Sequence, residues 1–206
     1  MNNDMISIID YGVGNVASVL NMVKHVGGEA NIISSPQDLE SATKLIFPGI
    51  GSFDYAVQCL QNNNWINALN STVLERKIPI LGICLGMQLM CKYSEEGILT
   101  GLGWIDAQVK RFTAGQEKLK IPHMGWNHVE VVSDNPLVIN EEPNQRFYFV
   151  HSYYVECNTE NDVILKSRYG INFVAGFQHK NIFGVQFHPE KSHRYGKQLI
   201  KQFLEV

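Results

Sequence analysis

The sequence has little positive charge and no long apolar run. Its 17 Lys and Arg residues face 20 Asp and Glu residues, and the formal net charge is -3. This balance lacks the basic footprint of proteins that bind nucleic acid or lie on anionic membranes. No apolar run approaches the ~20 residues that a membrane-spanning helix needs. We therefore expect neither a nucleic acid nor a membrane as a partner.

Cysteine is scarce, and its spacing excludes the common metal and redox motifs. The four cysteines are Cys59, Cys84, Cys91 and Cys157, and no two of them form a C-x-x-C pair. The opening Met-Asn-Asn-Asp lacks the basic region of a secretory signal. Free thiols without such a signal are typical of a reducing compartment, so we expect a cytoplasmic protein with no metal site.

The remaining composition is that of an ordinary globular protein. Apolar residues make up 45% of the sequence and charged residues 18%. Its 206 residues suffice for one domain with a sizeable core, and we expect a single domain over 1–206.

Short strands alternate with helices in the first half of the chain. The apolar pattern predicts strands over 5–10, 30–33, 44–47 and 80–83, and helices over 16–26, 54–60, 65–76 and 85–93, with a helix start at Pro36. This alternation predicts a parallel sheet with helices on both faces. Sites in such sheets lie at the carboxyl ends of the strands, so the turns after Asp10, Phe47 and Ile83 should share one rim.

The second half has a different pattern. Strand-like runs cover 107–112, 128–132, 146–150, 153–157, 163–166, 173–178 and 182–186, and an amphipathic helix covers 193–204. Turn residues separate the strands, which favours antiparallel pairing at the end of the same sheet. The predicted fold class is α/β, with a mixed, mostly parallel central sheet and antiparallel strands in the C-terminal half.

One stretch has the pattern of a catalytic turn. Gly82-Ile83-Cys84-Leu85-Gly86 follows a predicted strand and opens a predicted helix, which is the pattern of a nucleophile elbow with sulfur in place of a hydroxyl. The flanking glycines are needed because a Cβ there would collide with the neighbouring strand or helix. The helix N-terminus favours a thiolate at Cys84, and the Leu85 N–H points to where an oxyanion would form. The alternative is a buried structural cysteine.

A base and an orienting group follow near the end of the chain. A nucleophilic cysteine needs both, and residues i and i+2 of an extended segment project to the same side. His188 and Glu190 have this spacing, with Pro189 stiffening it. His188 is the best candidate base, and Glu190 would hold its tautomer. His151 is a competing base whose strand-end position suits substrate binding equally well.

Two glycine turns admit more than one interpretation. Gly12-x-Gly14-x-x-Ala17, with Glu29 downstream, fits the fingerprint of a nucleotide-binding module, which is weak evidence on its own. Gly49-Ile50-Gly51 could expose backbone N–H groups to an anion or oxyanion, or form a plain loop.

Taken together, these segments resemble class I, triad-type glutamine amidotransferases, which have a flavodoxin-like fold. The resemblance covers nearly the whole chain and is closest to the glutaminase subunits of imidazole glycerol phosphate synthases. It rests on the segments Ile9–Asn15, Phe47–Gly51, Gly82–Gln88, Ser94–Gly97, Pro122–Asn127, Phe149–Tyr153 and Phe187–Ser192. On this interpretation the first glycine turn belongs to the family, and the nucleotide match is a false positive.

The resemblance implies a role for each site residue. Cys84 would attack the glutamine amide, His188 would carry the proton to the leaving ammonia and Glu190 would orient His188, through a thioester that water hydrolyses. The N–H groups of Leu85 and of the Ile50–Gly51 turn would form the oxyanion hole. The residues expected to bind glutamine are Gly49, Gln88, Glu96, His151 and Tyr153. No cofactor is implied.

The resemblance also implies a partner. Such glutaminases form a heterodimer with a (β/α)8-barrel cyclase, which uses the ammonia to convert PRFAR to imidazole glycerol phosphate and AICAR in histidine biosynthesis. Trp126 and Tyr148 are candidates for the docking face, with Asn15 near the same rim, although Trp126 could instead be a core residue. The chain departs from the family pattern at 16–18 and 103–107. An alternative partner is therefore a sugar amidotransferase of surface polysaccharide synthesis.

Overall fold

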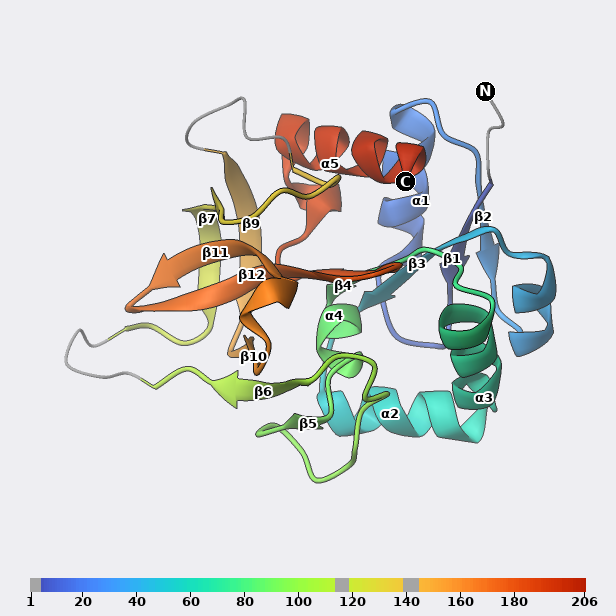
Figure 1. Cartoon of the computed structure of the whole chain (residues 1–206), viewed down its shortest axis with the longest axis horizontal. Helices are drawn as coiled ribbons and strands as arrows, with labels where there is room; N and C mark the ends of the chain where they lie inside the picture. The colour runs from blue at the N-terminus through green and yellow to red at the C-terminus, as the bar shows by residue number, and fades with distance from the viewer. Residues whose placement is uncertain (1–4, 114–118, 139–144) are drawn as a thin grey trace.

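A large mixed sheet runs through the molecule (Figure 1). The computed structural model describes residues 5–113, 119–138 and 145–206. Eleven strands form the sheet. Nine follow the order β2-β1-β3-β4-β13-β12-β10-β6-β5, while β11 pairs with β12 and β8 pairs with β11. A second sheet pairs β7 with β9. This arrangement confirms the predicted α/β fold class.

The strands are short, as the sequence predicts. Their bounds are β1 (Ile6–Ile9), β2 (Ala30–Ile33), β3 (Lys44–Gly49), β4 (Ile80–Cys84), β5 (Tyr93–Ser94), β6 (Ala107–Arg111), β7 (His123–His128), β8 (Glu130–Val131), β9 (Arg146–His151), β10 (Tyr153–Cys157), β11 (Val163–Tyr169), β12 (Ile171–His179) and β13 (Ile182–Val185).

Five neighbouring strands, β2, β1, β3, β4 and β13, run parallel to one another. Their carboxyl ends therefore share one rim, as expected for the turns that follow Asp10, Phe47 and Ile83. The pairing of β13 with β4 also places Val185 beside Ile83. The segments that follow these two residues carry His188 and Cys84, which are therefore brought to the same rim although 103 residues lie between them in the sequence.

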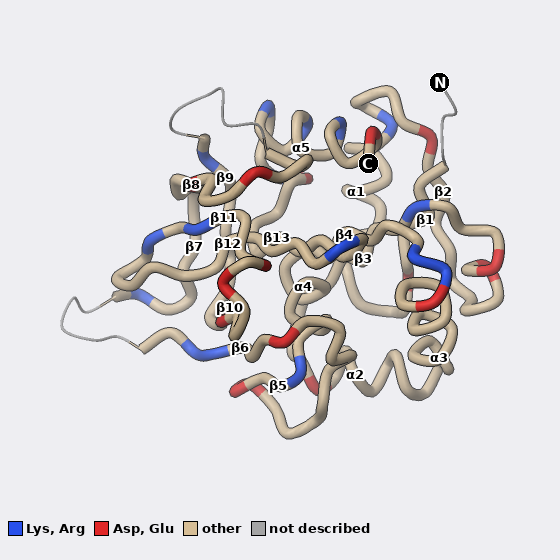
Figure 2. The backbone as a smooth tube through the Cα atoms, in the orientation of Figure 1, with Lys and Arg blue, Asp and Glu red and all other residues tan. Residues whose placement is uncertain are grey.

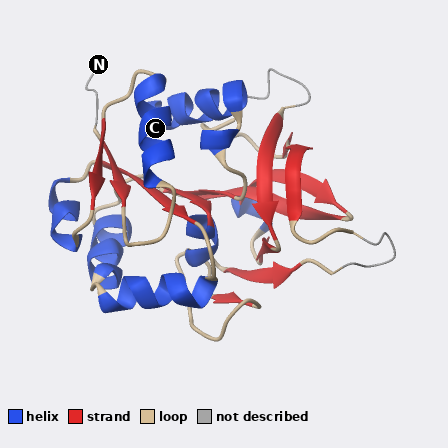
Figure 3. Cartoon of the chain, turned by 180° about the vertical axis from the view of Figure 1, so that it is seen from behind, coloured by secondary structure: helices blue, strands red, loops and turns tan. Residues whose placement is uncertain are grey.

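Helices cover both faces of the parallel strands (Figures 1 and 3). Helices α1 (Val16–His25) and α5 (His193–Glu205) lie on one face, and α2 (Phe53–Asn62), α3 (Trp65–Asn70) and α4 (Leu85–Leu89) lie on the other. Because successive strand residues point to opposite faces, β3 contributes Ile46 to the core under α1 and α5 and Phe47 to the core under α2 and α4. Four short helical segments complete the described chain: η1 (Pro36–Ser41), η2 (Ser71–Glu75), η3 (Glu160–Asp162) and η4 (Pro189–Lys191).

Strands β12, β10 and β6 continue the sheet in antiparallel pairs, which confirms the expectation for the second half. The prediction was wrong around 123–132, where two strands replace the single expected one. Strand β7 alternates exposed Met124, Trp126 and His128 with His123, Gly125 and Asn127, and it pairs only with β9 among the described strands, outside the large sheet. It therefore lacks the apolar run by which a central strand is recognised in a sequence.

Helix α4 is shorter than predicted and ends at Leu89 rather than near 93. The reason lies in the segment that follows. The Leu102 N–H donates to the Leu89 carbonyl at 2.8 Å, and the Trp104 N–H donates to the Met90 carbonyl at 2.9 Å. These bonds satisfy carbonyls that another helical turn would have used. The chain is thus free to leave the helix and form β5.

Charged residues of both signs are distributed along the described chain rather than gathered in one element (Figure 2). Among the helices in the described ranges, none combines the length and the apolar character that crossing a membrane would require.

Candidate active site

Cys84 lies at the junction between β4 and α4. Its backbone has φ 55° and ψ -110°, a strained combination for a residue with a side chain. A Cβ at Gly86 would overlap the carbonyl oxygen of Phe47 on β3, and one at Gly82 would lie 2.8 Å from the Met87 nitrogen. Both glycines are therefore sterically required, as predicted. The turn holds the sulfur at the carboxyl end of the central strand.

A cavity of about 340 Å³ opens at this rim. Its size falls in the usual range for small-molecule sites. The predicted site residues that line it are Ile50, Gly51, Cys84, Leu85, Gln88, Glu96, His151, Tyr153 and His188. It is also lined by Pro122, Val150, Ser152 and Lys191, which the sequence analysis did not select as site residues.

His188 and Glu190 form a buried pair beside Cys84. The His188 Nδ1 lies 2.8 Å from the Glu190 Oε1, and the two side chains are only 2% and 3% exposed. The His188 Nε2 is buried, with no partner of ordinary hydrogen-bond geometry among the described residues. Burial alone would lower the pKa of His188, but the interactions with Cys84 and Glu190 outweigh it and raise the pKa to about 10. The arrangement favours a protonated imidazole beside the Cys84 sulfur.

The glycine turn after β3 lies against the elbow. Gly49 is in register with Cys84, and a Cβ on Gly49 would lie 2.8 Å from the Gly86 nitrogen. Gly51 has φ +93°, a conformation that suits glycine. Ile50 and Gly51 line the cavity, whereas Gly49 packs behind it against the elbow backbone. The structure thus brings the predicted oxyanion segment next to the sulfur.

Glu96 provides a carboxylate at the cavity wall. It accepts a hydrogen bond from the Phe53 N–H at 2.9 Å, which fixes the side chain at the start of α2. Burial raises the pKa of Glu96, with a further contribution from the charge of Asp54, against the effect of the Phe53 hydrogen bond. The carboxylate is suited to accept hydrogen bonds from a ligand ammonium group.

His151 belongs to a hydrogen-bond chain whose direction is determined. Its Nδ1 lies 2.7 Å from the Tyr153 carbonyl, which can only accept, so Nδ1 carries the proton. Burial lowers the pKa of His151 to about 3, so the ring is neutral and its Nε2 accepts. The donor is His123 Nδ1 at 2.9 Å, and Asn127 Nδ2 donates in turn to His123 Nε2 at 3.2 Å. Both nitrogens of His151 are therefore occupied, whereas His188 remains the candidate base.

Two glutamine side chains connect the Tyr153 carbonyl to the Cys84 sulfur. The Gln88 Nε2 donates to the Tyr153 carbonyl at 3.1 Å and to the Gln186 Oε1 at 2.9 Å. The Gln186 Nε2 lies 3.6 Å from the Cys84 sulfur. Gln186, like His123 and Asn127, was not among the predicted site residues. The signal available for Gln186 was one polar residue in the apolar run 182–187.

The three predicted interface residues lie outside the cavity. Trp126 is 44% exposed, so it is not a core residue, and it stacks on His193 with ring centroids 5.4 Å apart. The Tyr148 ring lies 6.2 Å from that of Trp126, and the Lys191 Nζ lies 5.8 Å from the Tyr148 ring. Asn15 is the N-cap of α1.

The N-terminal glycine turn does not have the layout of a dinucleotide site. Ala17, at the position that should pack closely on the sheet, is exposed. The Glu29 carbonyl accepts from the Ile6 N–H at the amino end of β1, which is the opposite rim from the cavity. Gly14 packs instead against the Pro48 carbonyl, so the turn lies on the carboxyl end of β3.

Comparison with known proteins agrees with this geometry. Residues 7–206 match the family model described as "Glutamine amidotransferase class-I". The imidazole glycerol phosphate synthase subunit HisH of Leptospira interrogans is 47% identical over 204 residues, covering 98% of this chain and 100% of that protein. The subunit named HisH 2 of Methanococcus maripaludis is 48% identical over 201 residues, covering 98% of this chain and 99% of the relative.

Solved structures show the same fold at lower identity. A glutamine amidotransferase crystal structure aligns with TM-score 0.75 and 20% identity, covering 97% of each chain. PurLQS from Thermotoga maritima aligns with TM-score 0.74 and 18% identity, covering 98% of this chain and 97% of that one. The chain therefore belongs to the class I glutamine amidotransferase family, in which it groups with the HisH subunits of imidazole glycerol phosphate synthase.

Proposed function

We propose that this chain hydrolyses glutamine to glutamate and ammonia and supplies the ammonia to a cyclase subunit in histidine biosynthesis. One structural observation carries the proposal: Cys84 and His188 face one cavity, with Glu190 bonded to the far side of the imidazole. The names of its relatives support the pathway, since they are subunits of imidazole glycerol phosphate synthase.

The buried His188–Glu190 pair carries the proton transfers. In the proposed mechanism His188 takes the proton of the Cys84 thiol, and the thiolate attacks the side-chain amide carbon of glutamine. The C–N bond breaks as His188 gives its proton to the leaving nitrogen, which departs as ammonia. The resulting thioester is hydrolysed when neutral His188 takes a proton from water. Glutamate leaves and the thiolate is restored.

The cavity walls supply the remaining groups. In the proposed mechanism the N–H groups of Leu85 and of the Ile50–Gly51 turn stabilise the tetrahedral oxyanion, each for about 2.7–4 kcal/mol of the barrier. Glu96 would accept from the α-ammonium group of glutamine. Gln88 and the backbone near His151 and Tyr153 would bind the rest of the amino acid. A site of this kind needs both acceptors and donors because its ligand is a zwitterion.

We further propose a (β/α)8-barrel cyclase as the docking partner. The exposed Trp126, with Tyr148 and Lys191 beside it, offers an aromatic and a cationic contact close to the cavity. Aromatic side chains of this kind often anchor protein interfaces. Asn15 caps α1 by accepting from the Ser18 N–H and does not line the cavity, so its proposed contribution to docking is indirect.

Reconstitution tests the function. The purified chain is mixed with the cyclase subunit and PRFAR, and imidazole glycerol phosphate is measured with glutamine or with an ammonium salt as nitrogen source. Wild type should support both reactions, and Cys84→Ala should lose only the glutamine reaction. Full glutamine-dependent activity in Cys84→Ala would refute the mechanism. Glutamine hydrolysis without any product from the cyclase would favour the sugar amidotransferase alternative instead.

A further inference from the structure

Gln186 is a buried polar residue beside the nucleophile. It follows β13 directly, and its side chain is 0% exposed. Its backbone N–H already donates to the Ala175 carbonyl at 2.9 Å, so the position in the sheet is set without the side chain. A buried amide in an apolar segment costs free energy unless both of its ends are hydrogen-bonded. Here one end faces Gln88 and the other faces Cys84.

The orientation of the amide follows from its neighbours. The Tyr153 carbonyl can only accept, so the Gln88 group next to it must be the NH2 group, at 3.1 Å. That same NH2 group lies 2.9 Å from Gln186, which must therefore present its oxygen to Gln88. The Gln186 NH2 group is left facing the Cys84 sulfur at 3.6 Å. The Tyr153 carbonyl, acting through Gln88, thus makes Gln186 a donor to the Cys84 sulfur.

We propose that Gln186 is a further catalytic residue, which stabilises the Cys84 thiolate through a hydrogen bond donated to the sulfur. A hydrogen bond to the charged form of a group favours that form. The bond serves the reaction twice, because the sulfur is negative before it attacks the amide and again when the thioester breaks. This proposal rests on the glutaminase function proposed above, yet it concerns the sulfur itself and can be tested without glutamine.

The measurement is the pH dependence of alkylation of Cys84 by iodoacetamide. The full chain is treated over a range of pH, and the modified peptide is identified by mass spectrometry, because Cys59 and Cys157 are also free and half-buried. Gln186→Met keeps the volume of the side chain but donates no hydrogen bond. In this variant the midpoint pH of Cys84 alkylation should rise by about one unit, because the thiolate fraction at a given lower pH becomes about tenfold smaller. In Gln186→Glu, which also adds a negative charge, it should rise further.

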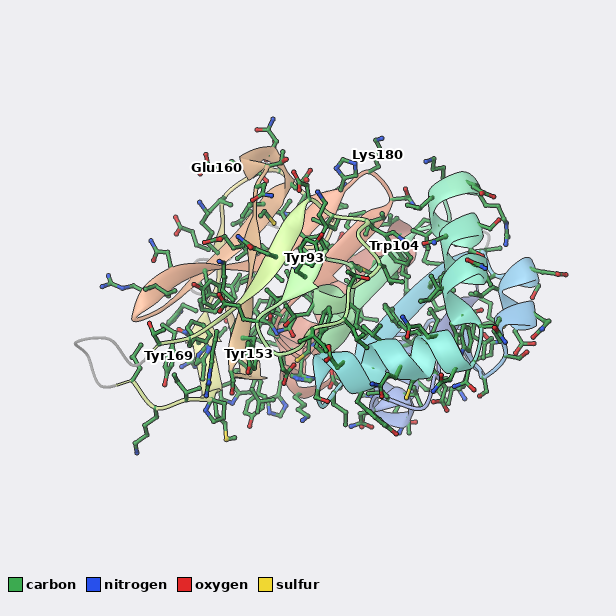
Figure 4. The ribbon with its side chains drawn as sticks, turned by 90° about the horizontal axis from the view of Figure 1, so that it is seen from below. Tyr93, Trp104, Tyr153, Glu160, Tyr169 and Lys180 are labelled. Atoms are coloured by element: carbon green, nitrogen blue, oxygen red, sulfur yellow. The ribbon has the colours of Figure 1, made fainter. Side chains whose placement is uncertain are left out.

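Gln178→Met is the matched control. Gln178 lies at the end of β12, where its side chain donates to the Lys180 carbonyl in the turn before β13. Figure 4 labels Lys180 and Tyr153, and the two lie on different sides of the molecule. The same substitution at Gln178 therefore removes an amide from the sheet far from the sulfur. It should leave the midpoint at the wild-type value.

The outcomes separate the proposal from the function on which it rests. A higher midpoint pH of Cys84 alkylation in both Gln186 variants, but not in Gln178→Met, supports the hydrogen bond to the sulfur, even if the chain released no ammonia from glutamine. A wild-type midpoint in either folded Gln186 variant overturns it. A third measurement needs no variant: the side-chain amide protons of Gln186 in wild type should shift in NMR spectra when Cys84 is alkylated. Unchanged resonances would likewise refute the hydrogen bond.

Discussion

His123 and His151 are joined by a hydrogen bond of 2.9 Å between two buried, neutral imidazoles. His123 lies on β7 and His151 ends β9, so the bond crosses the small sheet at the register pair nearest the cavity. The Tyr153 carbonyl fixes its direction, with His123 as donor. Burial lowers the pKa of His123 to about 4 and that of His151 to about 3. Because both imidazoles are buried and neutral, protonation in acid should disturb this hydrogen bond. The bond also connects the cavity to Asn127 on β7.

The buried pair predicts a loss of stability in acid. In the unfolded chain both histidines take up protons near pH 6.5, whereas the folded chain excludes them down to about pH 4 and pH 3. Stability is therefore fully present above pH 6.5 and falls below it, by about 2 kcal/mol for His151 between pH 6.5 and 5. His188 has a raised pKa, so its contribution is present below pH 6.5 and is lost toward pH 10.

Urea unfolding at pH 7 and pH 5 measures this loss. His123→Phe keeps a ring for stacking against Phe149 and Tyr169 but removes one titrating group, so its free energy of unfolding should depend less on pH than that of wild type. An equal dependence in the two proteins would show that the buried histidine pair is not the cause.

Asn127→Asp should impair the glutamine site from a distance. A carboxylate cannot donate to the His123 Nε2, and it attracts a proton to that atom, so the hydrogen-bond chain to His151 loses its direction. We expect the KM for glutamine to rise about tenfold, with a smaller change in kcat, because the defect lies in binding. Asn172→Asp places the same charge on β12, where Asn172 pairs with Arg168, whose carbonyl accepts from Asn127. Equal KM values in the two variants would contradict a specific role for Asn127.

Gly86→Ala should be much more harmful than Gly12→Ala. A Cβ at Gly86 overlaps the Phe47 carbonyl oxygen, and backbone cannot move aside cheaply. Gly12 has φ +94° but open space around it, so alanine there should cost only about 1–2 kcal/mol of backbone strain. We expect Gly86→Ala to lower the midpoint of thermal unfolding by more than Gly12→Ala does and to abolish glutaminase activity. Two equally stable variants would show that the elbow is not sterically closed.

Trp126→Ala should weaken docking without changing the cavity. Loss of a large aromatic anchor typically lowers affinity by 10-fold or more, an energy of about 1.4 kcal/mol. Calorimetry with the cyclase subunit measures this loss. Tyr93→Ala is the control, because Tyr93 is 60% exposed on β5 and lies on another element. An affinity that falls equally in both variants would place the docking face elsewhere.

The features that could be predicted from the sequence are local. The elbow at Cys84 and the His188–Glu190 spacing depend on neighbouring residues, and buried parallel strands such as β4 appear as apolar runs. Gln186 and His123 could not be predicted in this way, because their partners come from distant strands. Strand β7 was missed because it pairs outside the large sheet. The fingerprint at Gly12 is weak evidence in the sequence alone, because a turn that packs on a neighbouring strand needs the same glycines as one that binds a phosphate.

The central claim is that glutamine is cleaved through a covalent bond to the Cys84 sulfur. The complex with the cyclase subunit is mixed with glutamine, quenched in acid within one turnover and digested, and the peptides are examined by mass spectrometry. The account predicts a glutamyl adduct on the peptide that contains Cys84 and none in Cys84→Ser. Hydrolysis of glutamine at the wild-type rate with no adduct on Cys84, or with the adduct on Cys59 or Cys157, would contradict it.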